Sequence, residues 1–421
     1  MTSPQTLVPE IRFEGFSSAW EQRRLSELAN FSRGNGLSWA DVRADGANEC
    51  ILYGNLYTDY GMIADSVKYR TNTMPSNPSF SQYGDVLIPG SDTTPTGLAR
   101  ATSIEKSGVL LGGDINILRP TEKVDGSCLS IAINANKAEL IKLIKGITVR
   151  HIHNDDIKDV EIAFPVAKDE QRKLVGVFKT IDYLISLQQR KQNQLKNVKK
   201  SMLEKMFPRD GANVPEIRFA GFTNAWEQRK VTELLKNTSD AIKIGPFGSA
   251  LKKSFFTDKG IKVYAQENAF SGDFSIGNYY ISEAKYNELK SCELKPGDLV
   301  ISMMGTVGAC AIFPENAEKG IMNSHLLRLQ FSEEVLPEYI MFLLRDSQII
   351  RDQIDRLSVG SIMTGLSSTV VKKLVFPVPK RPEQQKIVEL LKQLDNFITL
   401  HQCKCDKLKD LKNSLLQKMF V

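Results

Sequence analysis

Two loops in matching places of the chain combine glycines with side chains that bind phosphates or base edges. The stretch FSRGNGLSW begins at Phe31, and its arginine and asparagine can each form two hydrogen bonds with a base, guanine and adenine respectively. The stretch IKIGPFGSALKKS begins at Ile242; its lysines and serines can donate to phosphates, and its glycines allow tight turns. A solvated turn is the plain alternative for either loop. The candidate DNA contacts here are Arg33, Asn35, Ser38, Lys243, Ser249, Lys252 and Lys253.

Hydroxyl and basic side chains recur in two further pairs of loops. GSDTTPTGLAR from Gly90 matches SMMGTVGA from Ser302, and KGITVRH from Lys145 matches VGSIMTG from Val359. We expect most of these side chains to position the DNA backbone rather than specify bases. The additional candidates are Ser91, Thr93, Thr94, Thr96, Arg100, Lys145, Thr148, Arg150, Thr306, Ser361 and Thr364.

Patterns typical of catalysis are incomplete. The methyltransferase-like stretch Asn77–Phe80 reads NPSF and lacks the second proline, and no glycine loop for S-adenosylmethionine precedes it. Asp273 with Glu283 and Lys285 has the letters of a metal-dependent nuclease, but such spacing is common on strand edges. We assign no catalytic residue.

Metal and nucleotide sites are equally weak in the sequence. His151 and His153 would share one face of a strand, as two metal ligands can, but a loop histidine pair at a DNA-facing edge is the better interpretation. The chain contains no G-x-x-x-x-G-K-[ST] stretch, so nucleotide hydrolysis would have to occur elsewhere. We assign no metal ligand.

The elements that would position the candidate loops occur twice. Residues 9–28 and 215–234 share fourteen of twenty aligned positions, including the entire Trp-Glu-Gln-Arg stretch. Each half closes with a second match, FPVAKDEQRK against FPVPKRPEQQK, and ends in LEKMF or LQKMF. Between these ends lie short apolar runs such as ECILY, DVLI, IKVYA and LVIS, which predict strands of a mixed α and β domain.

Each closing segment carries apolar residues at alternating spacings of three and four, from Leu174 to Met202 and from Ile387 to Leu415. This spacing predicts two long helices that pair as an antiparallel coiled coil. Both stripes lapse near the middle, where a polar layer would set the register. The alternative is that each stripe packs on its own domain. The predicted register residues are Gln188, Lys191, His401 and Lys404.

The repeat divides the chain into four expected parts: head domains at 1–168 and 208–380, and spacer helices at 169–207 and 381–421. A helix of that length spans about 57 Å, which matches about 17 base pairs of DNA. The expected fold is therefore mixed α/β (α+β), with two heads related by pseudo-two-fold symmetry and separated by a helical ruler.

Composition is compatible with this interpretation. Lys and Arg exceed Asp and Glu by 55 − 49 = 6, a mild basic excess that suits an acidic partner. The six cysteines are scattered, and no apolar run is long enough for a membrane span. We expect a soluble cytoplasmic protein with no disulfide framework.

The twin Trp-Glu-Gln-Arg motifs, the twin FPV…EQ…K helix starts and the variable blocks between them resemble the specificity (S) subunit of type I restriction-modification systems. The resemblance implies a non-catalytic subunit that binds double-stranded DNA and assembles with two methyltransferase (M) subunits and restriction (R) subunits. It implies that S-adenosylmethionine, ATP and Mg are bound by those partners, with no cofactor on this chain. A self-contained nuclease or methyltransferase, or a coiled-coil adaptor without DNA binding, remain alternatives.

Overall fold

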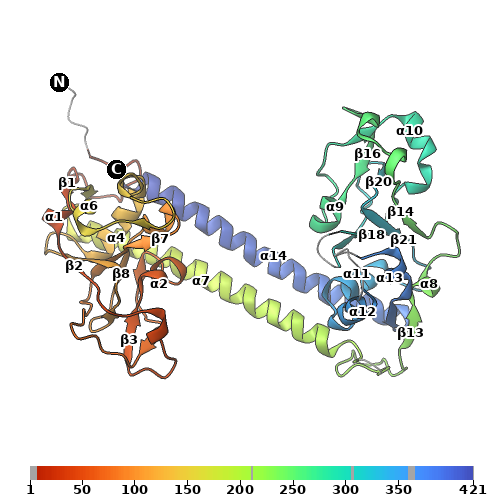
Figure 1. Cartoon of the computed structure of the whole chain (residues 1–421), viewed down its shortest axis with the longest axis horizontal. Coiled ribbons are helices and arrows are strands. Elements are labelled where there is room, and N and C mark those ends of the chain that lie inside the picture. The colour runs from red at the N-terminus through yellow and green to blue at the C-terminus, as the bar shows by residue number, and fades with distance from the viewer. Residues whose placement is uncertain (1–6, 210–211, 305–307, 359–365, 421) are drawn as a thin grey trace. The chain divides into compact units, whose positions relative to one another are not determined.

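The computed structural model describes residues 7–209, 212–304, 308–358 and 366–420 (Figure 1). The chain forms two compact units. Unit 1 is Met1–Arg190 with Gln402–Val421, and unit 2 is Lys191–His401. Each unit therefore holds one recognition head and one end of both long helices.

Unit 1 is built on a five-stranded sheet of order β2-β10-β6-β8-β4, beside a three-stranded sheet of order β5-β3-β9 and the two-stranded pairs β1-β12 and β11-β7. The strands are β1 (Glu21–Arg24), β2 (Ala29–Arg33), β3 (Asn48–Ile51), β4 (Ile63–Ala64), β5 (Tyr69–Thr71), β6 (Asp85–Pro89), β7 (Ser91–Asp92), β8 (Thr102–Ile104), β9 (Leu110–Leu111), β10 (Ile115–Pro120), β11 (Arg150–His151) and β12 (Glu161–Phe164).

Short helices connect these strands, and α4 packs against β6, β8, β10 and β12. They are α1 (Leu25–Leu28), η1 (Trp39–Asp41), α2 (Tyr53–Thr58), α3 (Pro95–Leu98), α4 (Gly126–Ala135), α5 (Lys137–Leu143) and α6 (Asn154–Ile157).

Unit 2 repeats this plan with sheets of order β14-β21-β18-β19 and β15-β17-β16-β20 and the pair β13-β22. Its strands are β13 (Glu227–Lys230), β14 (Ile242–Ile244), β15 (Phe256–Thr257), β16 (Ile261–Tyr264), β17 (Tyr280–Ile281), β18 (Leu299–Ser302), β19 (Cys310–Ile312), β20 (Gly320–Met322), β21 (Leu326–Leu329) and β22 (Val375–Val378). Its shorter helices are α8 (Val231–Leu234), η2 (Gly248–Ala250), η3 (Lys253–Phe255), α9 (Gln266–Ser271), α10 (Glu283–Glu288), η4 (Lys290–Cys292), α11 (Pro337–Asp346), α12 (Gln348–Ser358) and α13 (Ser368–Lys373).

The apolar runs of the sequence form strands, as predicted. ECILY contributes to β3, DVLI to β6, IKVYA to β16 and LVIS to β18, and every residue of β6 and β18 is buried. In β6, Val86 and Ile88 pack in one cluster with residues of α4, and Leu87 packs in another with Ile51 of β3. The mixed α and β fold class is confirmed.

The long helices are α7 (Lys168–Lys205) and α14 (Arg381–Lys418), each of 38 residues. Both begin with acidic residues in the first turn, where carboxylates favour the positive end of the helix dipole. In unit 1 the rings of Phe178 and Phe420 lie 6.1 Å apart, and Lys412 Nζ lies 2.5 Å from Asp182 Oδ1. The residue order along the two helices is opposite, so they pair antiparallel, as predicted (Figure 1).

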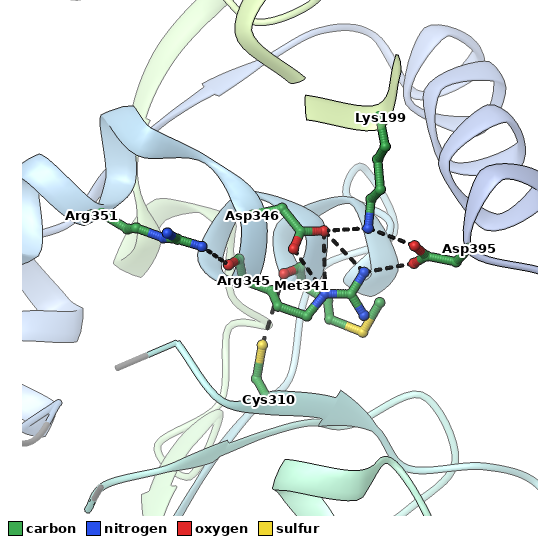
Figure 2. Close-up of polar contacts among 7 residues, drawn as sticks. All are labelled: Lys199, Cys310, Met341, Arg345, Asp346, Arg351 and Asp395. Atoms are coloured by element: carbon green, nitrogen blue, oxygen red, sulfur yellow. Dashed lines mark hydrogen bonds and ion pairs between the residues drawn. The ribbon is translucent and has the colours of Figure 1, made fainter. Parts of the chain in front are cut away.

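An ion-pair cluster marks the same pairing in unit 2. Figure 2 shows Lys199 of α7 between two carboxylates: its Nζ lies 2.8 Å from Asp346 Oδ2 and 2.6 Å from Asp395 Oδ1. Arg345 also contacts both carboxylates, at 2.9 and 2.7 Å. Burial raises the pKa of Asp346, but hydrogen bonds and charge attraction from Arg345 and Lys199 outweigh burial and lower it overall. The cluster therefore holds α7, α11 and α14 together.

The predicted apolar stripes are only partly buried. Leu174, Ile181 and Ile387 lie in the cores, whereas Val198 and Phe397 are 44% and 50% exposed. Burial moves instead to neighbouring positions such as Phe178, Leu391 and Cys405, because each helix also packs on its own sheet-and-helix core. The proposed polar register layer stays a prediction. Among the described helices, none is both long and apolar enough to cross a membrane.

Candidate nucleic-acid interface

The repeated opening motif of unit 1 folds back onto the start of α7. Strand β1 pairs antiparallel with β12, and Arg12 donates to Glu170 Oε1 and Oε2 at 2.7 and 2.9 Å. Trp20 Nε1 donates to the same carboxylate at 3.2 Å. Glu170 is 1% exposed. The hydrogen bond from Arg12 to Glu170 raises the pKa of Arg12. A buried carboxylate with these donors must keep its partners, so the motif fixes where the head meets the helix.

Unit 2 repeats the strand pairing and the arginine–glutamate contacts with the second copy of the motif, but Trp226 Nε1, unlike Trp20 Nε1, is buried without a hydrogen-bond partner among the described residues. Strand β13 pairs with β22, and Arg218 donates to both oxygens of Glu383 at 2.7 and 2.8 Å. A phenylalanine just after the end of the other long helix packs on the tryptophan of each motif: Phe420 on Trp20 at 5.5 Å in unit 1, and Phe207 on Trp226 at 6.1 Å in unit 2. We call the arginine–glutamate pair with this tryptophan and phenylalanine the hub of each unit. The residues that repeat in the sequence are therefore those that hold each scaffold.

One glycine in each unit sets the course of the first candidate loop. A Cβ on Gly34 would lie 2.0 Å from Gly112 O, and one on Gly245 would lie 1.8 Å from Asn323 O. Any side chain there would collide with backbone. The amide of Gly34 bonds to Ile115 O and that of Gly245 to Leu326 O, so the two loops leave equivalent strands at equivalent points.

In unit 1 a polar cluster forms at the ends of β2, β6 and β10. Ser91 Oγ lies 2.9 Å from Asp114 Oδ2 and 2.9 Å from His151 Nδ1. Arg33 pairs with Asp114 Oδ1 at 3.3 Å and lies 3.5 Å from His153 Nδ1. Asp114 has φ 58°, a left-handed conformation that is costly outside glycine and that often marks functional sites. The cluster brings an arginine and two histidines to one edge, which suits contacts with phosphate or bases.

A hairpin over residues 145–151 borders this cluster through the β11-β7 pair. Lys145 bonds to Asp156, and this hydrogen bond lowers the pKa of Asp156. Arg150 donates to Thr93 O at 2.5 Å. The structure thus gathers many of the predicted residues of unit 1. The gathered residues are Arg33, Ser91, Thr93, Lys145 and Arg150, and Thr148 is an exposed residue of the same hairpin.

Other candidates of unit 1 hold local structure. Ser38 caps η1 through Asp41, and Thr94 caps α3 by accepting from Gly97 N at 3.2 Å. Asn35 donates to Asn77 O at 2.9 Å. Arg100 donates to Leu56 O at 3.0 Å, and burial lowers its pKa; it lies in a cleft beside the long helices with Lys409. Thr96 is exposed on α3.

In unit 2 the predicted loop lies on β14, η2 and η3. Lys243 is half-buried on β14, while Ser249, Lys252 and Lys253 are exposed on the following turns. Three further predicted residues, Thr306, Ser361 and Thr364, lie outside the described residues.

Comparisons with known proteins agree with this arrangement. The family model for the type I restriction modification DNA specificity domain matches twice, over residues 17–197 and 226–410. The chain belongs to this family. It is a type I restriction-modification specificity subunit with two tandem recognition domains, and family membership implies DNA binding and assembly with methyltransferase and restriction subunits.

Individual relatives of this specificity subunit are distant. The type I restriction enzyme MjaVIII specificity subunit of Methanocaldococcus jannaschii is 20% identical over 411 residues, covering 96% of this chain and 92% of the relative. A putative MjaX specificity subunit of the same organism is 21% identical over 319 residues, covering 74% and 72%. A crystal structure of a type I S subunit from M. genitalium has a TM-score of 0.59 at 14% identity, covering 98% of this chain and 99% of that one.

The incomplete catalytic patterns have structural roles in the specificity subunit. Ser79 donates to Arg33 O at 2.8 Å, which ties the NPSF turn to the candidate loop. Asp273 accepts from the amide and hydroxyl of Ser275 in a local turn, and Lys285 pairs with Glu288. Within the described part of the chain, no group of three or more His, Cys, Asp or Glu side chains could hold a metal ion. The family is one of DNA specificity domains, and this confirms the prediction that the chain is a recognition subunit.

The sequence did not single out Asp114, the centre of the polar cluster. Its turn reads GGD, and unit 2 has His325 instead of an aspartate at the equivalent place. The two residues are equivalent because each carbonyl accepts the same backbone hydrogen bond, from Gly90 N to Asp114 O and from Met303 N to His325 O. In the sequence, only the two consecutive glycines before Asp114 could have indicated that this residue lies in an unusual turn.

Proposed function

We propose that each unit of this specificity subunit reads one part of a split, asymmetric DNA site. The observation that carries this proposal is that the two hubs share the same arginine–glutamate pair whereas the turns differ. At three equivalent positions unit 1 has Arg33, Ser91 and Asp114, where unit 2 has Ile244, Met304 and His325. Side chains of such different hydrogen-bonding capacity select different bases, so the two units would read unrelated half-sites.

We further propose that α7 and α14 set the unread gap and seat two methyltransferase subunits. The equal lengths of the helices and the equivalent hubs support two similar seats. In this assembly S-adenosylmethionine is bound by the methyltransferase subunits, and ATP and Mg by the restriction subunits. The chain's own contribution is recognition and spacing.

Single-molecule mapping of methylated bases tests the split site. DNA is compared from cells that express this chain with its cognate methyltransferase subunit and from cells that express the methyltransferase alone. We expect a two-part asymmetric motif only when the chain is present. A contiguous motif, or the same motif without the chain, would contradict the proposal.

The gap is tested by removing one heptad from both helices, residues 188–194 and 401–407, which are equivalent because Glu170 matches Glu383. The matched deletion shortens each helix by ~10 Å, or about three base pairs. We expect the same two half-sites with a shorter gap. Removal of residues 188–194 alone is the control, and it should abolish methylation because the paired helices lose register. An unchanged gap after the matched deletion would contradict the proposal that the two helices set the gap length.

A further inference from the structure

Unit 1 contains a cleft of about 820 Å³ next to the polar cluster, formed around η1, α2 and β5. Four aromatic side chains line it, above Leu37 and Leu52, which are buried. Trp39 is 63% and Tyr53 is 37% exposed, although large aromatic rings are normally covered in a folded protein. The four aromatic residues are Trp39, Tyr53, Tyr57 and Tyr69.

The rings of this cleft are held in place. Trp39 meets Tyr69 edge to face at 5.3 Å, and the Tyr69 hydroxyl donates to Asp59 Oδ2 at 3.0 Å. The Ser38–Asp41 capping box fixes the turn that carries Trp39. An aromatic face that is ordered before binding loses little conformational freedom when a planar ligand stacks on it.

The charged groups that line the cleft are carboxylates. Asp59 and Asp114 both line it, and the lining residues that the structure describes include no lysine or arginine. Burial raises the pKa of Asp59, but hydrogen bonds from Thr58 and Tyr69 lower it overall, so its carboxylate is charged at neutral pH. Each carboxylate has a cationic partner outside the lining, Lys68 for Asp59 at 3.4 Å and Arg33 for Asp114 at 3.3 Å. An exocyclic amino group of a base would find an acceptor in either carboxylate.

The neighbouring hairpin offers an apolar tip between basic residues. Ile147 is 89% and Val149 is 49% exposed, flanked in sequence by Lys145 and Arg150. The hairpin pairs with β7, whose Ser91 bonds to Asp114 at the cleft. Exposed isoleucines of this kind serve DNA-binding proteins as wedges that unstack a base step.

We propose that this cleft receives one unstacked DNA base that carries an exocyclic amino group, adenine or cytosine, stacked on Trp39. The inference rests on the proposed DNA-reading function and deepens it. Ile147 occupies the space that the base leaves, and Asp59 or Asp114 accepts from the amino group. Lys145 and Arg150 lie on the hairpin that would meet the backbone on either side.

Unit 2 lacks this set of aromatic residues at the equivalent place. Asn55 caps α2 by accepting from Leu52 N at 2.9 Å, and Asn268 caps α9 by accepting from Ala265 N at the same distance. This equivalence puts Gln266 where unit 1 has Tyr53, although the aromatic Phe270 stands where unit 1 has Tyr57. The unstacked base is therefore expected in the half-site of unit 1 alone.

The test uses the full chain assembled with its methyltransferase subunits on duplex DNA that contains the mapped site. 2-Aminopurine replaces each adenine in turn, and pyrrolocytosine each cytosine; both become brighter or change emission when they leave the stack. Methyltransferases themselves extrude their target base, so that position serves as an internal reference. We expect one further unstacked position, in the unit 1 half-site, whose signal disappears in Trp39→Ala and persists in Trp39→Phe.

Affinity gives a second readout. An abasic site opposite the unstacked base removes the cost of unpairing, so it should tighten binding by several-fold for the natural chain and not for Trp39→Ala. Trp39→Ala itself should weaken binding by about tenfold, since stacking on one aromatic ring is lost. Tyr83→Ala, which removes an aromatic residue 67% exposed outside the cleft, is the matched control.

The outcomes separate this inference from the proposed function. A split methylated motif with no additional unstacked position would leave the DNA-reading function intact and overturn the inference. Weaker methyltransferase assembly by Trp39→Ala, with DNA contacts unchanged, would also overturn it and would assign the cleft to a cationic protein side chain.

Discussion

Arg12 with Glu170 in unit 1 and Arg218 with Glu383 in unit 2 form the same buried ion pair at the same 2.7 Å distance. The turns at the ends of the central strands differ: an Asp114-centred polar cluster stands in unit 1, where unit 2 has His325. This difference shows which contacts are constrained by folding and assembly and which are open to change. Recognition can therefore vary in one unit while the other unit and both helices stay as they are.

The largest expected effect concerns the hubs. Arg12→Ala and Arg218→Ala each leave a buried carboxylate without its main partner, so each should lower the free energy of unfolding of its unit by about 3 kcal/mol. Calorimetric unfolding of the full chain measures this. Arg23→Ala, an exposed arginine of β1, is the control and should leave unfolding unchanged. A large loss in one unit and none in the other would break the equivalence of the hubs.

The next effect concerns the close backbone approach beneath the candidate loops. Gly34→Ala and Gly245→Ala each force a Cβ into a carbonyl oxygen, which should cost about 1–3 kcal/mol and displace the loop. We expect each variant to lose methylation at the mapped site, measured by protection from methylation-sensitive cleavage. Gly176→Ala in α7 has open space around its Cβ and should retain full methylation. Full methylation by both loop variants would show that these loops do not contribute to DNA recognition.

A smaller effect distinguishes the helix ion pairs. Lys199 contacts two carboxylates with its side chain 12% exposed, whereas Lys412 contacts Asp182 with its side chain 17% exposed. Lys199→Met should therefore destabilise its unit more, by about 2 kcal/mol against about 1 kcal/mol for Lys412→Met. Chemical denaturation of the two variants gives both values. Equal losses would show that the second carboxylate contributes nothing.

The smallest effect is a pH dependence of unit 2. The folded-state pKa of Asp346 is lowered from its ordinary value of 3.8, so its contribution to stability is present above that value and is lost as the pH falls through the folded pKa. The stability difference between the natural chain and Asp346→Asn should be largest near neutral pH and should shrink below pH 3.8. Thermal unfolding across this range measures it, and a constant difference would contradict the shift.

Much of the fold follows from the sequence because the repeated segments carry their own signals. The strands β6 and β18 are continuous apolar runs, and α7 and α14 have helical periodicity without internal proline after the first turn. The hub could not be read in the same way, since Arg12 and Glu170 are 158 residues apart. Nothing local in either segment identifies its partner.

The candidate site was predictable only as a set of loops. Arg33, Ser91 and Arg150 were expected from residue type, and the structure places them around one turn. Arg100 is equally basic in sequence, yet it supports α2 through Leu56 O. Side-chain direction decides between these roles, and it depends on backbone geometry such as the left-handed Asp114.

The central claim is that the hubs are interchangeable and the variable segments alone decide what is read. The most direct measurement replaces residues 235–372 with a second copy of residues 29–160 and maps methylated bases in cells that also express the cognate methyltransferase subunit. If the two heads are related by the pseudo-two-fold symmetry that the repeat predicts, two identical heads should read the unit 1 half-site as an inverted repeat. Methylation of the original asymmetric motif, or of a repeat in the same direction, would contradict the account.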